Sequence, residues 1–134
     1  FYIAKQAVKK IIAQGKHCSD TKVLIMGATF KEDVSDIRNS KVIDIVNEFR
    51  SFQVQVDLID PHASSKEMEH EYGIGLISEA SNDYDAIIVA VNHKKYKSMS
   101  EREFRAMMKD DLGIFVDVKG IFKGQIKDLE YWSL

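Results

Sequence analysis

The stretch Lys22-Val-Leu-Ile-Met26, continued by Gly27-Ala-Thr-Phe-Lys-Glu-Asp-Val-Ser-Asp-Ile-Arg-Asn-Ser40, decides the fold. Its first five residues form a short apolar run rich in branched side chains, which is typical of a strand buried on both faces. A polar loop follows, and then apolar residues recur at the spacing of an amphipathic helix, with Asn39 or Ser40 as its expected N-cap: Val42, Ile43, Ile45, Val46 and Phe49. A buried strand that leads through a loop into a helix predicts the first unit of a parallel α/β sheet.

The rest of the chain continues this alternation. Further strands are expected at 54–59, weakly at 74–77, most strongly at 85–91, then at 114–118 and in the tail 126–134, with helices at 64–72 and 100–109. An amphipathic helix precedes the first strand, because Ile3, Ala7, Val8 and Ile11 share one helical stripe. The pattern predicts an α/β fold, a Rossmann-like three-layer domain with a mostly parallel sheet and right-handed crossovers, preceded by an amphipathic helix.

Composition narrows the possible partners. The 134 residues fit one domain, and a formal net charge of −2 gives no general attraction to nucleic acid or to an anionic membrane. No apolar run approaches the roughly 20 residues that span a bilayer. Cys18 is the single cysteine, so no internal disulfide can form, and we expect a cytoplasmic protein. The four histidines stand singly in the sequence, without the spacing of a zinc site, and we predict no metal.

The loop after the first strand is the most informative candidate site, because ligands of open α/β sheets bind beyond the carboxyl ends of the strands. It has a single glycine and so lacks the G-x-G-x-x-G of dinucleotide-binding loops. Instead it offers Lys31 and Arg38, with Asp36 placed to orient the guanidinium. Cations on long stems suit recognition of phosphate by side chains. The alternative is a solvated charged loop with a local Asp–Arg pair.

Three other strand ends carry polar residues. Asp60 ends the second strand 33 residues after Gly27, where an acid either caps the turn with Pro61 or binds ribose hydroxyls. Lys119 follows Asp117 at the end of a late strand, so it either meets Lys31 at the same sheet edge or lies exposed. For a diphosphate site, we expect Lys31, Arg38 and Lys119 to gather along one rim of the sheet. The basic cluster of residues 93–97 is expected to be solvated. We find no nucleophile elbow, P-loop or activated cysteine, and therefore assign no catalytic residue.

The stretch from Gly27 to Ser40 closely resembles the opening motif of the carboxy-terminal domain of the UDP-glucose/GDP-mannose dehydrogenase family. That pattern runs roughly G-x-[TA]-F-K-x-[ND]-x-x-D-x-R-x-S. Eight residues of this chain match it: Gly27, Thr29, Phe30, Lys31, Asp33, Asp36, Arg38 and Ser40. Asp60-Pro61, the apolar strand before Val91 and the stretch from Phe115 to Gly120 extend the resemblance along nearly the whole chain.

The resemblance implies an NAD-dependent enzyme that oxidises the C6 hydroxyl of a UDP-sugar to a carboxylate with two NAD⁺ and a catalytic cysteine. By the same resemblance, Phe30, Lys31 and Lys119 bind the UDP-sugar, and Arg38 reaches the phosphates of the cofactor. Some relatives have arginine where this chain has Lys119. The details look most like the branch that acts on UDP-N-acetylhexosamines and supplies uronic acids for bacterial surface polysaccharides.

The resemblance also implies that this chain is a piece of a longer enzyme. Residues 1–16 would end the central dimerisation helix, and residues 17–134 would form the carboxy-terminal UDP-sugar-binding domain. The NAD-binding domain and the catalytic cysteine would belong to the missing amino-terminal half, since Cys18 does not match the surroundings of that cysteine. We therefore expect no dehydrogenase activity from this chain alone, and a homodimer for the full-length enzyme.

Two other interpretations were weighed. A phospho-acceptor receiver domain has a similar size and fold, but it requires an acidic pair after the first strand, where this chain has Met26-Gly27. A free-standing module that senses UDP-sugars without oxidising them fits the same binding residues. A stop codon just upstream of Phe1 would favour that module over a piece of an enzyme.

Overall fold

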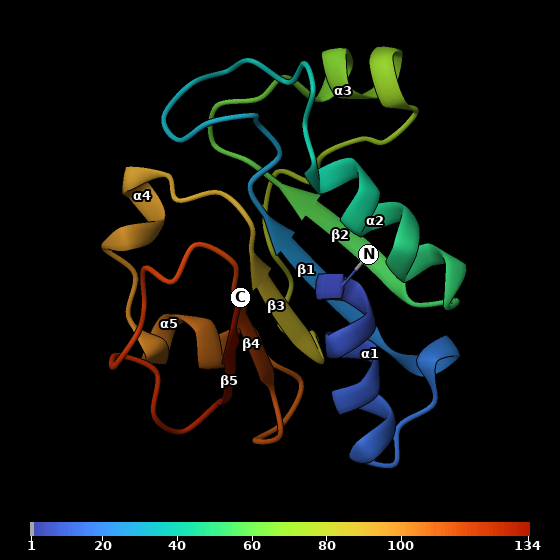
Figure 1. Cartoon of the computed structure of the whole chain (residues 1–134), viewed down its shortest axis with the longest axis vertical. Helices are drawn as coiled ribbons and strands as arrows, with labels where there is room; N and C mark the ends of the chain where they lie inside the picture. Colours follow the sequence, from blue (N-terminus) through green and yellow to red (C-terminus); the bar gives the residue numbers. More distant parts are fainter. Residues whose placement is uncertain (1) are drawn as a thin grey trace.

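The computed structural model describes residues 2–134. In chain order its elements are α1 (Tyr2–Ala13), a 3-10 turn η1 (Cys18–Asp20), β1 (Lys22–Met26), α2 (Val42–Ser51), β2 (Gln55–Ile59), α3 (Ser65–Tyr72), β3 (Ala86–Val89), α4 (Lys94–Lys97), α5 (Glu101–Ala106), β4 (Ile114–Asp117) and β5 (Glu130–Ser133). Figure 1 shows these strands side by side in one twisted sheet with helices on either side.

The five strands are all parallel and lie in the order β2-β1-β3-β4-β5. The predicted α/β fold is therefore confirmed, and the expected tail strand is β5. The weak strand expected at 74–77 is wrong, because that segment crosses β2 as a loop and only Ile77 bonds to it, through its N–H to the Leu58 carbonyl at 2.9 Å. The helix expected at 100–109 is shorter, and the short helix α4 was not foreseen.

Alternation of side chains along each strand divides the interior into two apolar cores. Val23 and Ile25 face one core with α1, α2 and Met68 of α3, whereas Leu24 and Met26 face the other. The second core is rich in aromatic rings, where Phe104 of α5 meets Phe115 and Phe122 edge to face. Burial on both faces explains why β1, β3 and β4 appear in the sequence as nearly continuous apolar runs, whereas β2 and β5, at the two edges of the sheet, are more polar.

Helix α1 packs on this domain through Ala4, Ala7, Val8 and Ile11, against α2 and β4. The apolar stripe that the sequence predicts is therefore the face that packs on this domain. The division at residue 16 stays a prediction. Across residues 2–134, no helix combines the length and apolar character that a membrane crossing requires.

Gly27 sets the course of the loop that follows β1. Its φ is +106°, and a Cβ at this position would lie 2.6 Å from the Cβ of Val91 and 2.9 Å from its backbone nitrogen. Only glycine satisfies both conditions. The loop after β1 therefore lies in close contact with the loop after β3, and residues from both meet at one end of the sheet.

Candidate functional site

The candidate site lies at the carboxyl ends of β1 and β3. From β1 the chain goes to β2 on one side and later to β3 on the other, so these two strands mark the point where the strand order reverses. Open α/β sheets bind ligands in the crevice at this point. A cavity of about 310 Å³ occupies it, lined by the loops after β1, β3 and β4 and by the start of α2.

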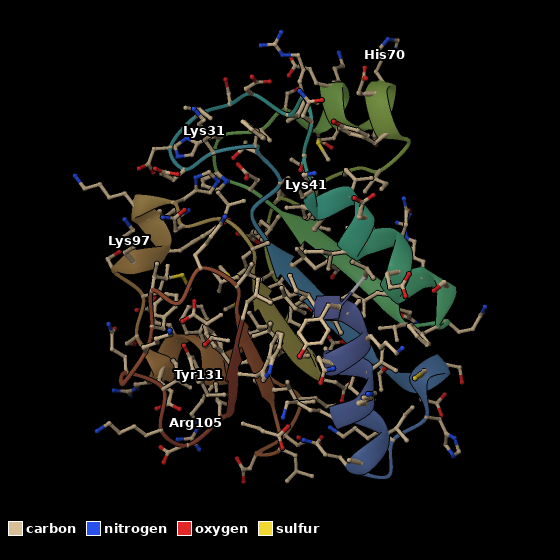
Figure 2. The ribbon with its side chains drawn as sticks, viewed as in Figure 1. Lys31, Lys41, His70, Lys97, Arg105 and Tyr131 are labelled. Carbon is tan, nitrogen blue, oxygen red and sulfur yellow. The ribbon has the colours of Figure 1, made fainter. Side chains whose placement is uncertain are left out.

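Three lysines line this cavity: Lys31 after β1, Lys41 at the start of α2 and Lys119 after β4. None of them forms an ion pair with a carboxylate of residues 2–134. Glu32 is the one acid in the lining. Figure 2 shows Lys31 on the loop and Lys41 where α2 begins. The cavity therefore offers uncompensated positive charge, which suits an anionic ligand.

Phe30 and Lys31 are presented by a tight local structure. The Phe30 N–H donates to the Asp36 carbonyl at 3.0 Å, and the Thr29 hydroxyl donates to the Lys31 carbonyl at 2.7 Å. These bonds leave the Phe30 ring 50% exposed, with Lys31 Nζ 5.9 Å from its centroid. An exposed aromatic ring beside a cation is a surface available to a partner or a ligand.

Arg38 does not share the lysine cavity. It lines a second hollow of about 510 Å³, between residues 35–38 and α3. Asp36 holds its guanidinium through two hydrogen bonds, of 3.0 and 3.1 Å, as the sequence predicted, and the side chain is 82% exposed. The hydrogen bonds and attraction of Arg38 lower the pKa of Asp36. Lys31 and Lys119 thus come together as expected, but the expectation that Arg38 joins them along one rim of the sheet is wrong, because Arg38 lines a different hollow.

Asp117 fastens the loop that carries Lys119. Its buried carboxylate accepts hydrogen bonds from the N–H groups of Ile121 and Phe122 at 3.1 and 2.8 Å, and from the Tyr131 hydroxyl at 2.6 Å. Burial and the bond to Asp117 raise the pKa of Tyr131 to about 12. The turn after β4 is therefore fixed from within the sheet, and Lys119 starts from a rigid base.

Asp60 and His93 form a buried pair beneath the loop after β1. One carboxylate oxygen of Asp60 accepts from the Ala28 N–H at 2.7 Å and lies 2.8 Å from His93 Nε2. The other accepts from the N–H groups of His62 and Ala63. Asp60 thus caps the turn at Pro61, the first of the two roles considered. His93 is fully buried, so its predicted solvation is wrong, although Lys94, Lys95 and Lys97 are exposed.

The protonation state of Asp60 follows from this geometry. Burial by itself raises the pKa of the carboxyl group, but the hydrogen bonds from Ala28, His93, His62 and Ala63 outweigh burial and bring the net pKa below its ordinary value. Asp60 is therefore an anion near neutral pH, acting as an acceptor that joins the loops after β1, β2 and β3.

Asp33, His62 and His93 approach one another in a way that their sequence positions did not suggest. One potential ligand atom of each lies within 4.8 Å of the others. However, the lone pair of His93 Nδ1 already accepts the Asp33 N–H at 2.9 Å, and Asp33 Oδ1 accepts the Lys94 N–H at 2.7 Å. A metal would have to displace these bonds, because a ring nitrogen has only one lone pair to offer. Asp33, His62 and His93 are better described as the place where the loops after β1, β2 and β3 contact one another.

Two functional features escaped prediction from the sequence. Lys41 is not singled out by the sequence, although its place at the end of the loop makes it line the same cavity as Lys31 and Lys119. His93 was grouped with neighbouring lysines, whereas the apolar strand before it was a signal that position 93 lies near the sheet. Its partners are 33 and 60 residues away, so no local pattern identifies them.

Comparison with known proteins agrees with this geometry. The family model for the UDP binding domain of the UDP-glucose/GDP-mannose dehydrogenase family matches residues 24–124. UDP-N-acetyl-D-glucosamine 6-dehydrogenase of Salmonella typhi is 39% identical over 129 residues, which are 96% of this chain and 30% of that protein. The enzyme of the same name from Pseudomonas aeruginosa is 38% identical over the same shares. The chain thus spans about 30% of the length of these relatives.

Solved structures show the same fold. A dehydrogenase from Methanosarcina mazei described as acting on NDP-N-acetyl-D-galactosaminuronic acid superposes with a TM-score of 0.83 at 19% identity, over 98% of this chain and 28% of that one. The UDP-N-acetyl-mannosamine dehydrogenase Cap5O of Staphylococcus aureus gives 0.75 at 24% identity, over 98% and 30%.

Proposed function

Because this chain belongs to the UDP-glucose/GDP-mannose dehydrogenase family, we propose that its lysine-lined cavity binds the diphosphate of a UDP-sugar. Lys31 and Lys119 would contact the phosphates, Lys41 would add a third positive charge, and Phe30 would pack against the nucleotide or sugar. The observation that carries the proposal is the convergence of these lysines, without carboxylate partners in residues 2–134, where β1 and β3 end. Charge-assisted hydrogen bonds to phosphate are among the stronger contacts available to a protein.

We propose further that the full-length protein is an NAD-dependent 6-dehydrogenase, which converts the C6 hydroxyl of the sugar to a carboxylate. Two NAD⁺ would accept the four electrons, and the groups that perform the oxidation would lie outside this chain. The names of the relatives that are 38–39% identical favour a UDP-N-acetylhexosamine as the sugar. In this scheme the present chain supplies binding and contributes no reacting group.

Arg38 would contact the phosphates of NAD in the assembled enzyme. Its position supports this role, because the guanidinium is exposed, held by Asp36 and outside the lysine cavity, where a second ligand would not compete with the first. Arg38→Ala should therefore raise the KM for NAD⁺ roughly 10- to 100-fold in the full-length enzyme, with little change in the KM for UDP-sugar. Steady-state kinetics with each substrate varied would test this, and an unchanged KM for NAD⁺ would remove the role.

The binding proposal can be tested on this chain by NMR. We expect UDP and UDP-N-acetylglucosamine to bind weakly, with dissociation constants weaker than micromolar, and to shift the amide signals of residues 29–31, 90–92 and 119. Lys31→Ala should weaken UDP binding, whereas Lys97→Ala, which removes an exposed lysine from α4, serves as the matched control. Shifts confined to other surfaces, or equal affinity in both variants, would contradict the assignment.

A further inference from the structure

We propose that His93 is a positioning residue for the substrate loop, defined here as residues 28–33: its Nδ1 holds the Asp33 end of the loop so that Phe30 and Lys31 are ordered before ligand arrives. This inference rests on the proposed function, since it assigns a purpose to the order of Lys31. It is carried by a separate observation, which is the buried hydrogen-bond pattern around the ring.

The partners of His93 fix its tautomer. A backbone N–H can only donate, so Nδ1 accepts from Asp33, at 2.9 Å. The Asp60 carboxylate can only accept, so the ring hydrogen lies on Nε2, which faces Asp60 Oδ2 at 2.8 Å and Thr29 Oγ1 at 3.3 Å. The Thr29 hydroxyl is free to accept because its own hydrogen is directed to the Lys31 carbonyl. Each polar atom of the ring therefore has a defined direction.

The substrate loop is held at both ends by this one unit. Asp60 binds the Ala28 N–H at 2.7 Å, and His93 binds the Asp33 N–H. Between these points lie Phe30 and Lys31, where the Phe30 N–H donates to the Asp36 carbonyl and the Thr29 hydroxyl donates to the Lys31 carbonyl. Asp33 has a φ of +58°, a left-handed conformation that a non-glycine residue adopts only when its surroundings hold it there. The hydrogen bond from the Asp33 N–H to His93 is one such contact, and the hydrogen bond from the Lys94 N–H to Asp33 Oδ1 is a second.

The ring itself has little freedom to move. It is fully buried between the edges of His62 and Tyr96, with ring centroids 4.8 and 5.4 Å away. A buried ring with both nitrogens hydrogen-bonded is rigid, in contrast to the exposed Lys31, which lies two residues before the Asp33 N–H that the ring holds. Ordering a residue carries a cost in backbone conformational entropy. Because folding already orders the substrate loop, ligand binding does not lose this conformational entropy again, and the affinity for the ligand is higher.

Two variants distinguish the roles of the two ring nitrogens, because each places an amide group near one of them. His93→Asn places an acceptor near Nδ1 and so can retain the Asp33 bond, whereas His93→Gln places its amide near Nε2 and so can retain only the Asp60 bond. We expect His93→Asn to keep the hydrogen-exchange protection of the Asp33 amide and to bind UDP within about 3-fold of the unmodified chain. His93→Gln should lose that protection and bind UDP roughly 5- to 10-fold more weakly, the equivalent of one neutral hydrogen bond.

A residue that merely filled the core would give a different result, since both variants would then lose affinity in proportion to their loss of unfolding free energy. That outcome would overturn the inference, as would unchanged UDP affinity in His93→Gln when Lys31→Ala binds weakly. If Lys31→Ala binds UDP normally, the proposed function fails, and Asp33 amide exchange still decides whether His93 holds the loop.

One measurement needs no variant. An N–H···N hydrogen bond transmits a scalar coupling between its two nitrogens, and we expect this coupling between the Asp33 amide and His93 Nδ1 in the unmodified chain, with and without UDP. Its absence in the ligand-free chain would show that the loop is not held beforehand, which would overturn the inference even if neither variant folds.

Discussion

Lysines at the two ends of this parallel sheet are in opposite situations. At the amino ends of β1 and β3, Lys16 lies 3.0 Å from Asp85 and 3.3 Å from Asp110, and Lys22 lies 3.3 Å from Asp57 and 3.4 Å from Asp83. At the carboxyl ends, the three lysines of the cavity have no such partner within residues 2–134.

The contrast distinguishes lysines that stabilise the fold through ion pairs from lysines that are available to bind a ligand. Burial alone would lower the pKa of Lys16, but hydrogen bonds and attraction from Asp85 and Asp110 outweigh it, and the pKa is raised. Its carboxylate partner Asp85 is almost fully buried and also binds the Lys22 N–H. A lysine in that position stabilises the molecule, whereas a lysine without a carboxylate partner is free to meet an external anion. The first two of the following experiments test this division, and the third tests the carboxylate beneath the substrate loop.

The largest effect is expected from removing two lysines of the cavity together. Lys31→Met with Lys119→Met should weaken UDP binding by about 100-fold or more, because each charge-assisted bond contributes about 1.5–3 kcal/mol. The free energy of unfolding should stay close to its original value, since no internal partner is lost. Titration with UDP and chemical denaturation measure the two quantities. The control is the double variant Lys5→Met with Lys97→Met, which removes two exposed lysines outside the cavity. An equal loss of UDP affinity in the control would mean that the lysines of the cavity have no special role in binding.

The next effect concerns the other end of the sheet. Lys16→Met should lower the free energy of unfolding by about 1.5–3 kcal/mol, because Asp85 would remain buried without its cation. UDP binding should not change. Urea denaturation of this variant beside Lys5→Met, an exposed lysine on α1, provides the comparison. A variant as stable as the control would mean that this ion pair contributes nothing measurable.

The smallest effect comes from acid titration of Asp60. Its pKa in the folded state lies below the ordinary 3.8, so its contribution to stability is present above that value and is lost as pH falls through the folded pKa. The difference in unfolding free energy between the unmodified chain and Asp60→Asn should therefore shrink as pH falls below about 4. Denaturation curves between pH 6 and pH 2.5 measure it. A constant difference over this range would argue that Asp60 has the same pKa in the folded and unfolded states.

Much of the fold could be predicted because its information is local. The apolar run from Lys22 to Met26 has the bounds of β1, and burial in the centre of the sheet explains why β3 beside it is equally apolar. The pairing of Asp36 with Arg38 and the capping by Asp60 are contacts over two or three residues, which a sequence displays directly. The N-cap of α2 was misplaced slightly: the helix begins at Val42 with Lys41 before it, while the Ser40 hydroxyl accepts the Val42 N–H.

The remaining features of the site depend on contacts between residues that are far apart in the sequence, which no local pattern predicts. His93 stands beside three exposed lysines, and only the approach of Asp33 and Asp60 from distant loops makes it a core residue. The course of the loop between Lys31 and Arg38 is equally hard to predict, because Asp33, which lies between them, adopts a positive φ that its residue type permits but does not require. The roles of Phe30, Lys31, Lys119 and Arg38 toward ligands stay predictions until binding is measured.

The contact at Gly27 also limits how such a domain can diverge. Even glycine in place of Val91, which would remove the Cβ that lies 2.6 Å away, would leave the backbone nitrogen 2.9 Å from any Cβ at position 27. No compensating substitution at position 91 can therefore make room. In a library selected for altered sugar preference, we expect accepted changes to accumulate among residues 30–41, while position 27 remains invariant.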